Sequence, residues 1–284
     1  MKIWTTAFYV AFGFCVGNSD SIASAQPMLI SDAAPQCVFS GQSRNIAVVW
    51  RNPGDAIVGA EISARILQTS SVTVVKSGET LWKKLRVLPQ QTVFESAQLD
   101  FPAVKAETKF FVQWLENSNS VIGKTEVLVY PTNLLAELKL LVDESENNLG
   151  VLDPNKQLKP ALKSSAIKFV DLEEAVLDDF SGKLAIVGPC GPDDPEWYGL
   201  ASRIGKLARK GTPVVWIQSP PQKRGKFQPS FYSVPENTNV VVVVQPDLVV
   251  DLPDNPQSQL NLINFCKLAL NPQPPVLPDL SIQP

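Results

Sequence analysis

The pattern of apolar and polar residues divides the chain into two regions. Over residues 39–130, short segments alternate apolar and polar side chains at every second position, as at 62–66 and 124–130. Turn-forming sequences such as Asn52-Pro53-Gly54-Asp55 separate these segments. Alternation with period two between frequent turns is typical of antiparallel sheets with one buried face. We therefore expect an all-β, immunoglobulin-like sandwich in this region.

After Pro131 the apolar residues follow helices and strands in alternation. Strands are expected over 149–152, 167–172, 183–187, 213–218 and 240–244, and helices over 133–142, 157–165, 194–211 and 257–270. The last two strands are almost continuously apolar, which is typical of parallel strands covered on both faces. Right-handed crossovers then give an α/β, doubly wound, mostly parallel sheet of the flavodoxin-like type. Ligands of such sheets bind at the carboxyl ends of the strands.

The first 25 residues have the features of a secretory signal peptide. Lys2 precedes an apolar stretch over 3–16, and Ala23-Ser24-Ala25 stands before Gln26. We expect cleavage after Ala25 and export to the periplasm or the extracellular space. An uncleaved anchor is disfavoured because the apolar stretch is shorter than the roughly 20 residues that a spanning helix needs. No stable membrane span is therefore expected after cleavage.

These patterns predict four segments. They are a signal peptide over 1–25, a sandwich over 26–131, an α/β domain over 132–271 and a mobile, proline-rich tail over 272–284. The length of 284 residues is sufficient for two domains that each bury a core. A net charge of -3 offers no basic field for phosphates, so nucleic acid is not an expected partner.

Two residue types limit the chemistry. The chain contains no histidine, which excludes Ser-His and Cys-His hydrolase mechanisms and zinc sites built on His. After cleavage three cysteines remain, Cys37, Cys190 and Cys266, and this odd number leaves at least one unpaired within the chain.

No cofactor and no metal are expected. The first α/β strand turns through Asp153-Pro154-Asn155, which is no glycine-rich phosphate loop. An acidic cluster contains Asp171, Glu173, Glu174, Asp178 and Asp179. We interpret it as a solvated helix face, with a divalent cation site as the alternative.

Three tryptophans fall in segments with strand periodicity. They are Trp50, Trp82 and Trp114. Two interpretations are open: the three side chains pack in a shared core, or they form an aromatic platform that binds sugars. Core packing is the preferred interpretation, because large aromatic side chains contribute heavily to burial.

Four elements within residues 149–220 follow one another in a characteristic order. One strand ends in Asp153, another ends in Gly188-Pro189, a helix follows, and the next strand reads Thr212-Pro213-Val214-Val215-Trp216-Ile217. With this order the segment resembles the type 1 glutamine amidotransferase-like fold. In that family this last strand leads into a nucleophile elbow, where a Cys works with a His and an acidic residue. The resemblance also implies a carbohydrate association, since similar degenerate domains follow immunoglobulin-like sandwiches in bacterial carbohydrate-associated proteins.

This chain departs from the family at the elbow. The equivalent stretch is Gln218-Ser219-Pro220-Pro221, which contains no cysteine. Ser219 is a poor substitute, because Pro220 lacks the backbone N–H that the residue after the nucleophile supplies to the oxyanion hole. The resemblance therefore implies a degenerate module without the family's activity.

Candidate ligand-binding residues are those expected at the carboxyl ends of the strands. They are Asp153, Gly188, Cys190, Asp193, Asp194, Gln218 and Ser219. Cys190 is expected in a loop, where Asp193 and Asp194 would raise the pKa of its thiol and so oppose nucleophilic chemistry. No catalytic residue is assigned.

The leading hypothesis is an exported, non-catalytic binding or interaction protein, whose partner is a carbohydrate or an envelope protein. One alternative is a carboxylate-dependent saccharide hydrolase that uses Asp153, Asp193 or Asp194, since two acids can act without histidine. The other is a structural component of an envelope assembly, joined through sandwich edge strands and the tail.

Overall fold

The computed structural model describes most of the chain after the expected signal peptide. The described residues are 28–30, 34–41, 43–69, 73–117, 120–143, 147–173, 179–190, 197–218, 240–245 and 247–271. The segments expected to form the signal peptide, the proline-rich tail and the elbow after Gln218 lie outside this set. So do the candidate residues Asp193, Asp194 and Ser219.

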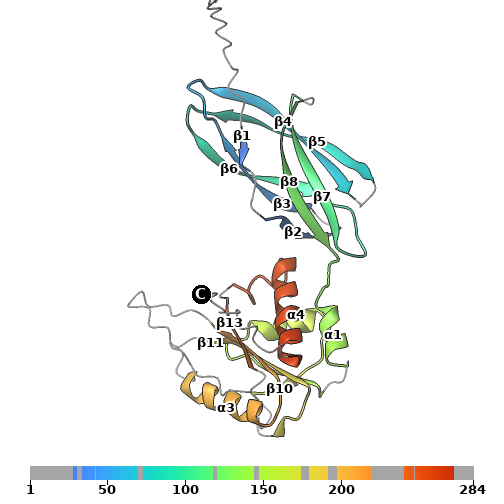
Figure 1. The fold of residues 1–284 in the computed structure, drawn as a ribbon, viewed down its shortest axis with the longest axis vertical. Helices are drawn as coiled ribbons and strands as arrows, with labels where there is room; N and C mark the ends of the chain where they lie inside the picture. The colour runs from blue at the N-terminus through green and yellow to red at the C-terminus, as the bar shows by residue number, and fades with distance from the viewer. Residues whose placement is uncertain are drawn as a thin grey trace, which may run out of the picture.

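The N-terminal region forms two β-sheets (Figure 1). The first has the strand order β1-β3-β6 with antiparallel pairs. The second has the order β2-β8-β7-β4-β5, antiparallel except for the parallel pair of β2 and β8. The strands are β1 Met28–Ile30, β2 Gln36–Phe39, β3 Ser43–Arg51, β4 Val58–Thr69, β5 Val74–Val87, β6 Thr92–Asp100, β7 Thr108–Glu116 and β8 Ser120–Tyr130.

Apolar side chains from both sheets meet in one core, which confirms the predicted sandwich. Trp50 of β3 and Trp114 of β7 are fully buried there, and the partly buried Trp82 packs beside them. The ring centroids of Trp82 and Trp114 lie 5.2 Å apart, and those of Trp50 and Trp114 lie 6.0 Å apart. The tryptophans are therefore core residues, as preferred from the sequence.

The C-terminal region forms one sheet of parallel strands. Its order is β10-β9-β11-β12-β13, so the second strand of the domain precedes the first. This is the flavodoxin-like order, and the predicted α/β class is confirmed. The strands are β9 Leu149–Leu152, β10 Val170–Asp171, β11 Leu184–Cys190, β12 Val214–Gln218 and β13 Val240–Val244.

Helices cover both faces of the parallel sheet. Buried residues around α1 (Ala136–Leu141), α2 (Leu158–Ser164) and α4 (Pro256–Leu270) share a core with one face. Those of α3 (Trp197–Arg209) share a core with the other face. Among the described residues, no helix combines the length and apolar character that a membrane span requires.

The strand β10 and the helix α1 are shorter than the sequence pattern predicts by at least three residues each. The expected strand over 167–172 shrinks to the two residues of β10. Ile167 still donates its N–H to Leu162 O at the end of α2, and Ala166 has a φ of 53°. The chain is therefore still leaving the helix where the apolar run begins. The expected helix over 133–142 likewise starts only at Ala136.

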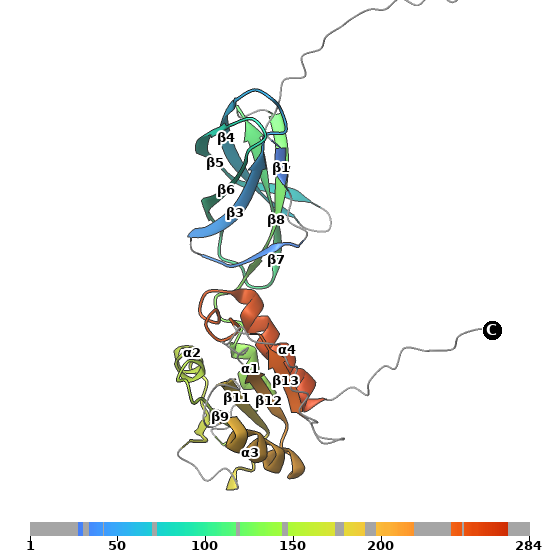
Figure 2. The same cartoon turned by 90° about the vertical axis from the view of Figure 1, so that its left-hand side faces the viewer.

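The two regions lie end to end, with α4 at the junction (Figures 1 and 2). This helix contacts β2 of the sandwich, and the Cys37 thiol lies 3.6 Å from Gln257 Oε1. Gln259, also in α4, is buried and accepts hydrogen bonds from the backbone N–H groups of Leu134 and Leu135. The segment that joins the two regions is thus fixed to the last described helix.

Candidate functional site

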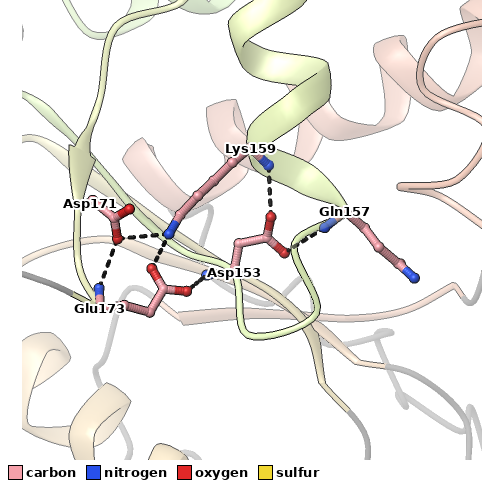
Figure 3. A network of polar contacts seen from close by, with 5 residues as sticks. All are labelled: Asp153, Gln157, Lys159, Asp171 and Glu173. Atoms are coloured by element: carbon pink, nitrogen blue, oxygen red, sulfur yellow. Dashed lines mark hydrogen bonds and ion pairs between the residues drawn. The ribbon is translucent and has the colours of Figure 1, made fainter.

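Asp153 stands at the carboxyl end of β9, where a doubly wound sheet is expected to bind ligands. The chain turns after the strand, and Lys156 N–H donates to Asp153 O. The Asp153 carboxylate is buried and accepts the N–H of Gln157 at 3.1 Å and that of Lys159 at 2.8 Å (Figure 3). Both carboxylate oxygens therefore cap the first turn of α2. Pro160 fits this turn because it has no N–H to satisfy.

Lys159 connects the start of α2 with the strand beside it. Its ammonium lies 2.7 Å from Asp171 Oδ1 and also contacts the Glu173 carboxylate (Figure 3). Glu173 in turn accepts the backbone N–H of Asp153 at 2.5 Å, and its own N–H donates to Asp171 Oδ1 at 3.0 Å. Asp153, Gln157, Lys159, Asp171 and Glu173 form a closed polar network, called here the edge network.

The charged groups of the edge network shift one another's pKa values. Hydrogen bonds with Glu173 and Lys159 lower the pKa of Asp171, whereas burial, followed by the neighbouring Asp171, raises the pKa of Glu173. Burial opposes the charge of Lys159, but its hydrogen bonds to Asp171 and Glu173 outweigh this and raise its pKa. Lys159 is therefore an ammonium at neutral pH and cannot serve as a base or nucleophile.

The gap between the ends of β9 and β11 is bridged by Asn155. Its side-chain N–H donates to Pro189 O at 2.6 Å. The crossovers leave β9 toward β10 on one side and β11 toward β12 on the other, so this gap is the topological switch point of the sheet. A hydrogen bond within the chain thus spans the place where related topologies hold a ligand.

Gly188 and Cys190 belong to the packed interior of β11. A Cβ on Gly188 would lie 2.8 Å from Ile217 Cβ, so a side chain there would collide with β12. Cys190 was expected in a loop, and this placement is wrong, because it is the last residue of the strand and is 1% exposed. The register of β11 against β12 shifts between Val187 and Cys190, around Pro189, which cannot donate to the ladder.

Gln218 ends β12 and is half-buried. It is paired with Cys190 on β11 and with Val244 on β13. The structure therefore brings Gly188, Cys190 and Gln218 together on the neighbouring strands β11 and β12, and β11 is the strand beside β9, which Asp153 follows.

The described thiols form no disulfide, and Cys37 and Cys266 lack the surroundings that activate cysteine. Burial raises the pKa of Cys266 to about 12. Burial and the nearby Glu107 carboxylate raise the pKa of Cys37. Neither thiol is therefore a ready nucleophile.

Two residues of the acidic cluster do not lie on the helix face that was predicted for them. Asp171 lies on β10, Glu173 follows it two residues later, and both contact Lys159. Glu174 and Asp178 are not among the described residues. Within the described part of the chain, no three metal-ligating side chains gather into a cluster.

One exposed aromatic side chain was not predicted from the sequence. Phe94 is the third residue of β6 and is 79% exposed. The sequence does contain a pattern that predicts this position. The apolar residues Val93, Ala97 and Leu99 are separated by even numbers of residues and so share one face of a strand, which places Phe94 on the opposite face.

No protein-family model and no curated protein matches this chain. Solved structures share partial likeness. The Pseudomonas fluorescens alkylpurine DNA glycosylase AlkC bound to abasic-site DNA has 12% identity and a TM-score of 0.29 over 38% of this chain and 31% of that chain. The Listeria innocua β-glucosidase complex with gluconolactone has 16% identity and a TM-score of 0.28 over 38% of this chain and 16% of that chain.

A third structure is the CsuC–CsuE chaperone–tip adhesion subunit complex from Acinetobacter baumannii Csu pili. It has 9% identity and a TM-score of 0.27 over 38% of this chain and 58% of that chain. This chain spans less than a third of the glycosylase and less than a fifth of the glucosidase. These partial likenesses identify no shared family or activity.

Proposed function

We propose that this protein is an exported, non-catalytic binding or interaction protein. Its sandwich is of the immunoglobulin-like type, and its α/β domain is a degenerate amidotransferase-like module that serves as a scaffold. One observation supports this proposal: among the described residues, the polar groups Asp153, Asn155 and Lys159 around the switch point are engaged with other parts of the chain. Asp153 caps α2, Asn155 bonds Pro189, and Lys159 bonds two carboxylates.

Acid–base catalysis requires a carboxyl group that reaches the substrate and exchanges a proton with it. Asp153 is 1% exposed, and both of its oxygens already accept backbone N–H groups. Moving it toward a substrate would break the cap of α2 and leave buried donors unsatisfied. This cost supports a structural role for Asp153 over a role as hydrolase acid or base.

A turnover assay on the mature protein, residues 26–284, tests the non-catalytic proposal. Chromogenic amide, ester and glycoside substrates should be converted no faster by the protein than by buffer. Asp194→Asn and Asp153→Asn variants, purified in the same way, serve as matched controls for contaminating enzymes. Turnover by the wild type that disappears in Asp194→Asn would establish a carboxylate-dependent hydrolase and overturn the proposal.

Export has its own test. Expression of the full chain in a bacterial host should yield a periplasmic or secreted protein, and intact-mass analysis should place its first residue at Gln26. Recovery of the uncleaved chain in the membrane fraction would contradict the assignment of a cleaved signal peptide.

A further inference from the structure

The register of the three-stranded sheet decides which side chains face away from the core. Leu29, Trp50 and Val93 are paired across β1, β3 and β6 and pack into the sandwich core. Successive residues of a strand point to opposite faces. The next row, Ile30, Val49 and Phe94, therefore faces outward. Figure 2 looks onto the side of the sandwich that carries β1 and β3.

This outward row is apolar and open. Phe94 is 79% exposed, Ile30 is 41% exposed, and Val49 between them is half-buried. Met28, on the same face of β1, is exposed as well. A ring so exposed adds little to the stability of the sandwich. Contiguous exposed apolar groups of this kind mark binding surfaces more often than scattered single ones do.

Uncharged hydrogen-bonding side chains surround the aromatic ring. Thr92, Ser96 and Gln98 lie on β6 at even spacing from Phe94, and Asn45 is paired with Gln98 across the sheet. All four are exposed. The formal charges on this face, Arg51 and Asp100, stand at its two ends, where Asp100 already accepts a hydrogen bond from Ser43. Between these ends the face combines one flat apolar ring, in the row next to Arg51, with neutral donors and acceptors.

We propose, building on the non-catalytic binding function, that this face binds a neutral glycan chain. A pyranose ring has an apolar C–H face and a rim of hydroxyl groups. Its apolar face matches the exposed Phe94 ring, and its hydroxyls match the amide and hydroxyl groups of Asn45, Ser96 and Gln98. Because the centre of the face carries no charge, it favours neutral over anionic polysaccharides.

The size of the face favours a chain-like ligand over a protein. The nine-residue strands β3 and β6 are about 30 Å long and the three-residue β1 about 10 Å, so at a strand spacing of about 4.8 Å the face covers roughly 340 Å². A stable protein–protein interface needs about 800 Å² from each partner. The face is therefore too small for a stable dimer, whereas an extended saccharide can lie along β6.

Affinity electrophoresis of the mature protein tests this assignment. The gels contain hydroxyethyl cellulose, glucomannan or arabinoxylan as neutral probes, and alginate as the anionic probe. Retardation is expected in at least one neutral gel and not in alginate. Phe94→Ala should weaken binding at least about tenfold, as expected when a stacked aromatic ring is removed, and Phe94→Trp should retain it.

Phe111→Ala is the matched control. Phe111 lies on β7, where Lys109 and Lys124 stand over its ring on the outer face of the other sheet. Its loss should leave retardation unchanged. Absence of retardation in every neutral gel, or retardation that survives Phe94→Ala, would overturn the glycan assignment. So would light scattering that shows a dimer dependent on Phe94. None of these results bears on the turnover assay, so the two proposals fail separately.

Discussion

The carboxyl edge of the parallel sheet and the outer face of the three-stranded sheet use their polar residues in opposite ways. The edge carries charged groups in the position expected of a site, yet they are bonded to one another and to backbone. The outer face carries no charge at its centre, and its aromatic ring is exposed. Whether a polar side chain is available to a ligand therefore depends more on its partners within the chain than on its residue type.

The largest expected effect concerns Asp153, where the edge is most deeply buried. Asp153→Ala removes a charged acceptor from two backbone donors, and we expect it to lower the free energy of unfolding by about 2–4 kcal/mol. Urea denaturation measures this loss. Asp254→Ala, at an exposed aspartate, is the control and should change stability by less than about 0.5 kcal/mol. If both variants were equally stable, Asp153 would not have the structural role assigned to it.

Gln259 is an uncharged polar residue whose side chain is also engaged with partners in the same chain. Gln259→Ala leaves Leu134 N–H, Leu135 N–H and Leu252 O without their partner, so a loss of about 1–3 kcal/mol is expected. Thermal or urea unfolding of the full chain reports it. Gln257→Ala, at an exposed position of the same helix, should lose clearly less. Glycan retardation should be the same in both variants.

Acid should weaken the edge network. Because the folded state lowers the pKa of Asp171, this carboxylate stabilises the fold above its unfolded pKa of about 3.9, and the contribution is lost as the pH falls toward the folded value. The raised pKa of Glu173 has the opposite sign and offsets part of the loss.

Asp171→Asn should therefore cost less than about 1 kcal/mol at pH 6. It should also reduce the fall in stability below about pH 4, where an unfolded Asp becomes protonated. The measurement is the urea midpoint of the wild type and of the variant at a series of pH values from about 6 to below about 4. An unchanged acid profile in the variant would show that the pair with Lys159 contributes nothing to stability.

The smallest expected effect on stability is at Phe94, on the exposed face of the three-stranded sheet. Phe94→Ala should change the free energy of unfolding by no more than about 0.5 kcal/mol, because the ring is mostly in water. Phe110→Ala, in the core of the same sandwich, should cost about 3–5 kcal/mol. If Phe94→Ala were as damaging as Phe110→Ala, Phe94 would be a packing residue and its value as a binding group would fall.

The fold class was accessible from the sequence because both periodicities are strong. Residues 149–152 and 240–244 are strands with the bounds that their apolar runs predict, and the order of elements led to the flavodoxin-like sheet. Cys190 was misplaced because a Gly-Pro pair signals a loop. Here β11 accommodates Pro189 through a register shift and continues to Cys190.

The edge network was beyond sequence reasoning for a physical reason. Lys159 meets Asp171, and Asp153 meets Glu173, only because β10 folds back beside β9, and spacing along the chain does not encode such contacts. Phe94 was missed because residues 92–100 were not recognised as a strand. Once β6 is placed, the phase of Val93 and Leu99 assigns Phe94 to the outer face.

The position of α4 has a consequence for the order in which the molecule assembles. This helix, the last described element of the chain, contacts β2 of the first region and carries the glutamine that fastens the connecting segment. A nascent chain can complete its sandwich long before these residues emerge. Before α4 is in place, the contacts of this helix with β2 and with the connecting segment cannot form, so the mutual orientation of the two regions depends on an element that is synthesised after both sheets.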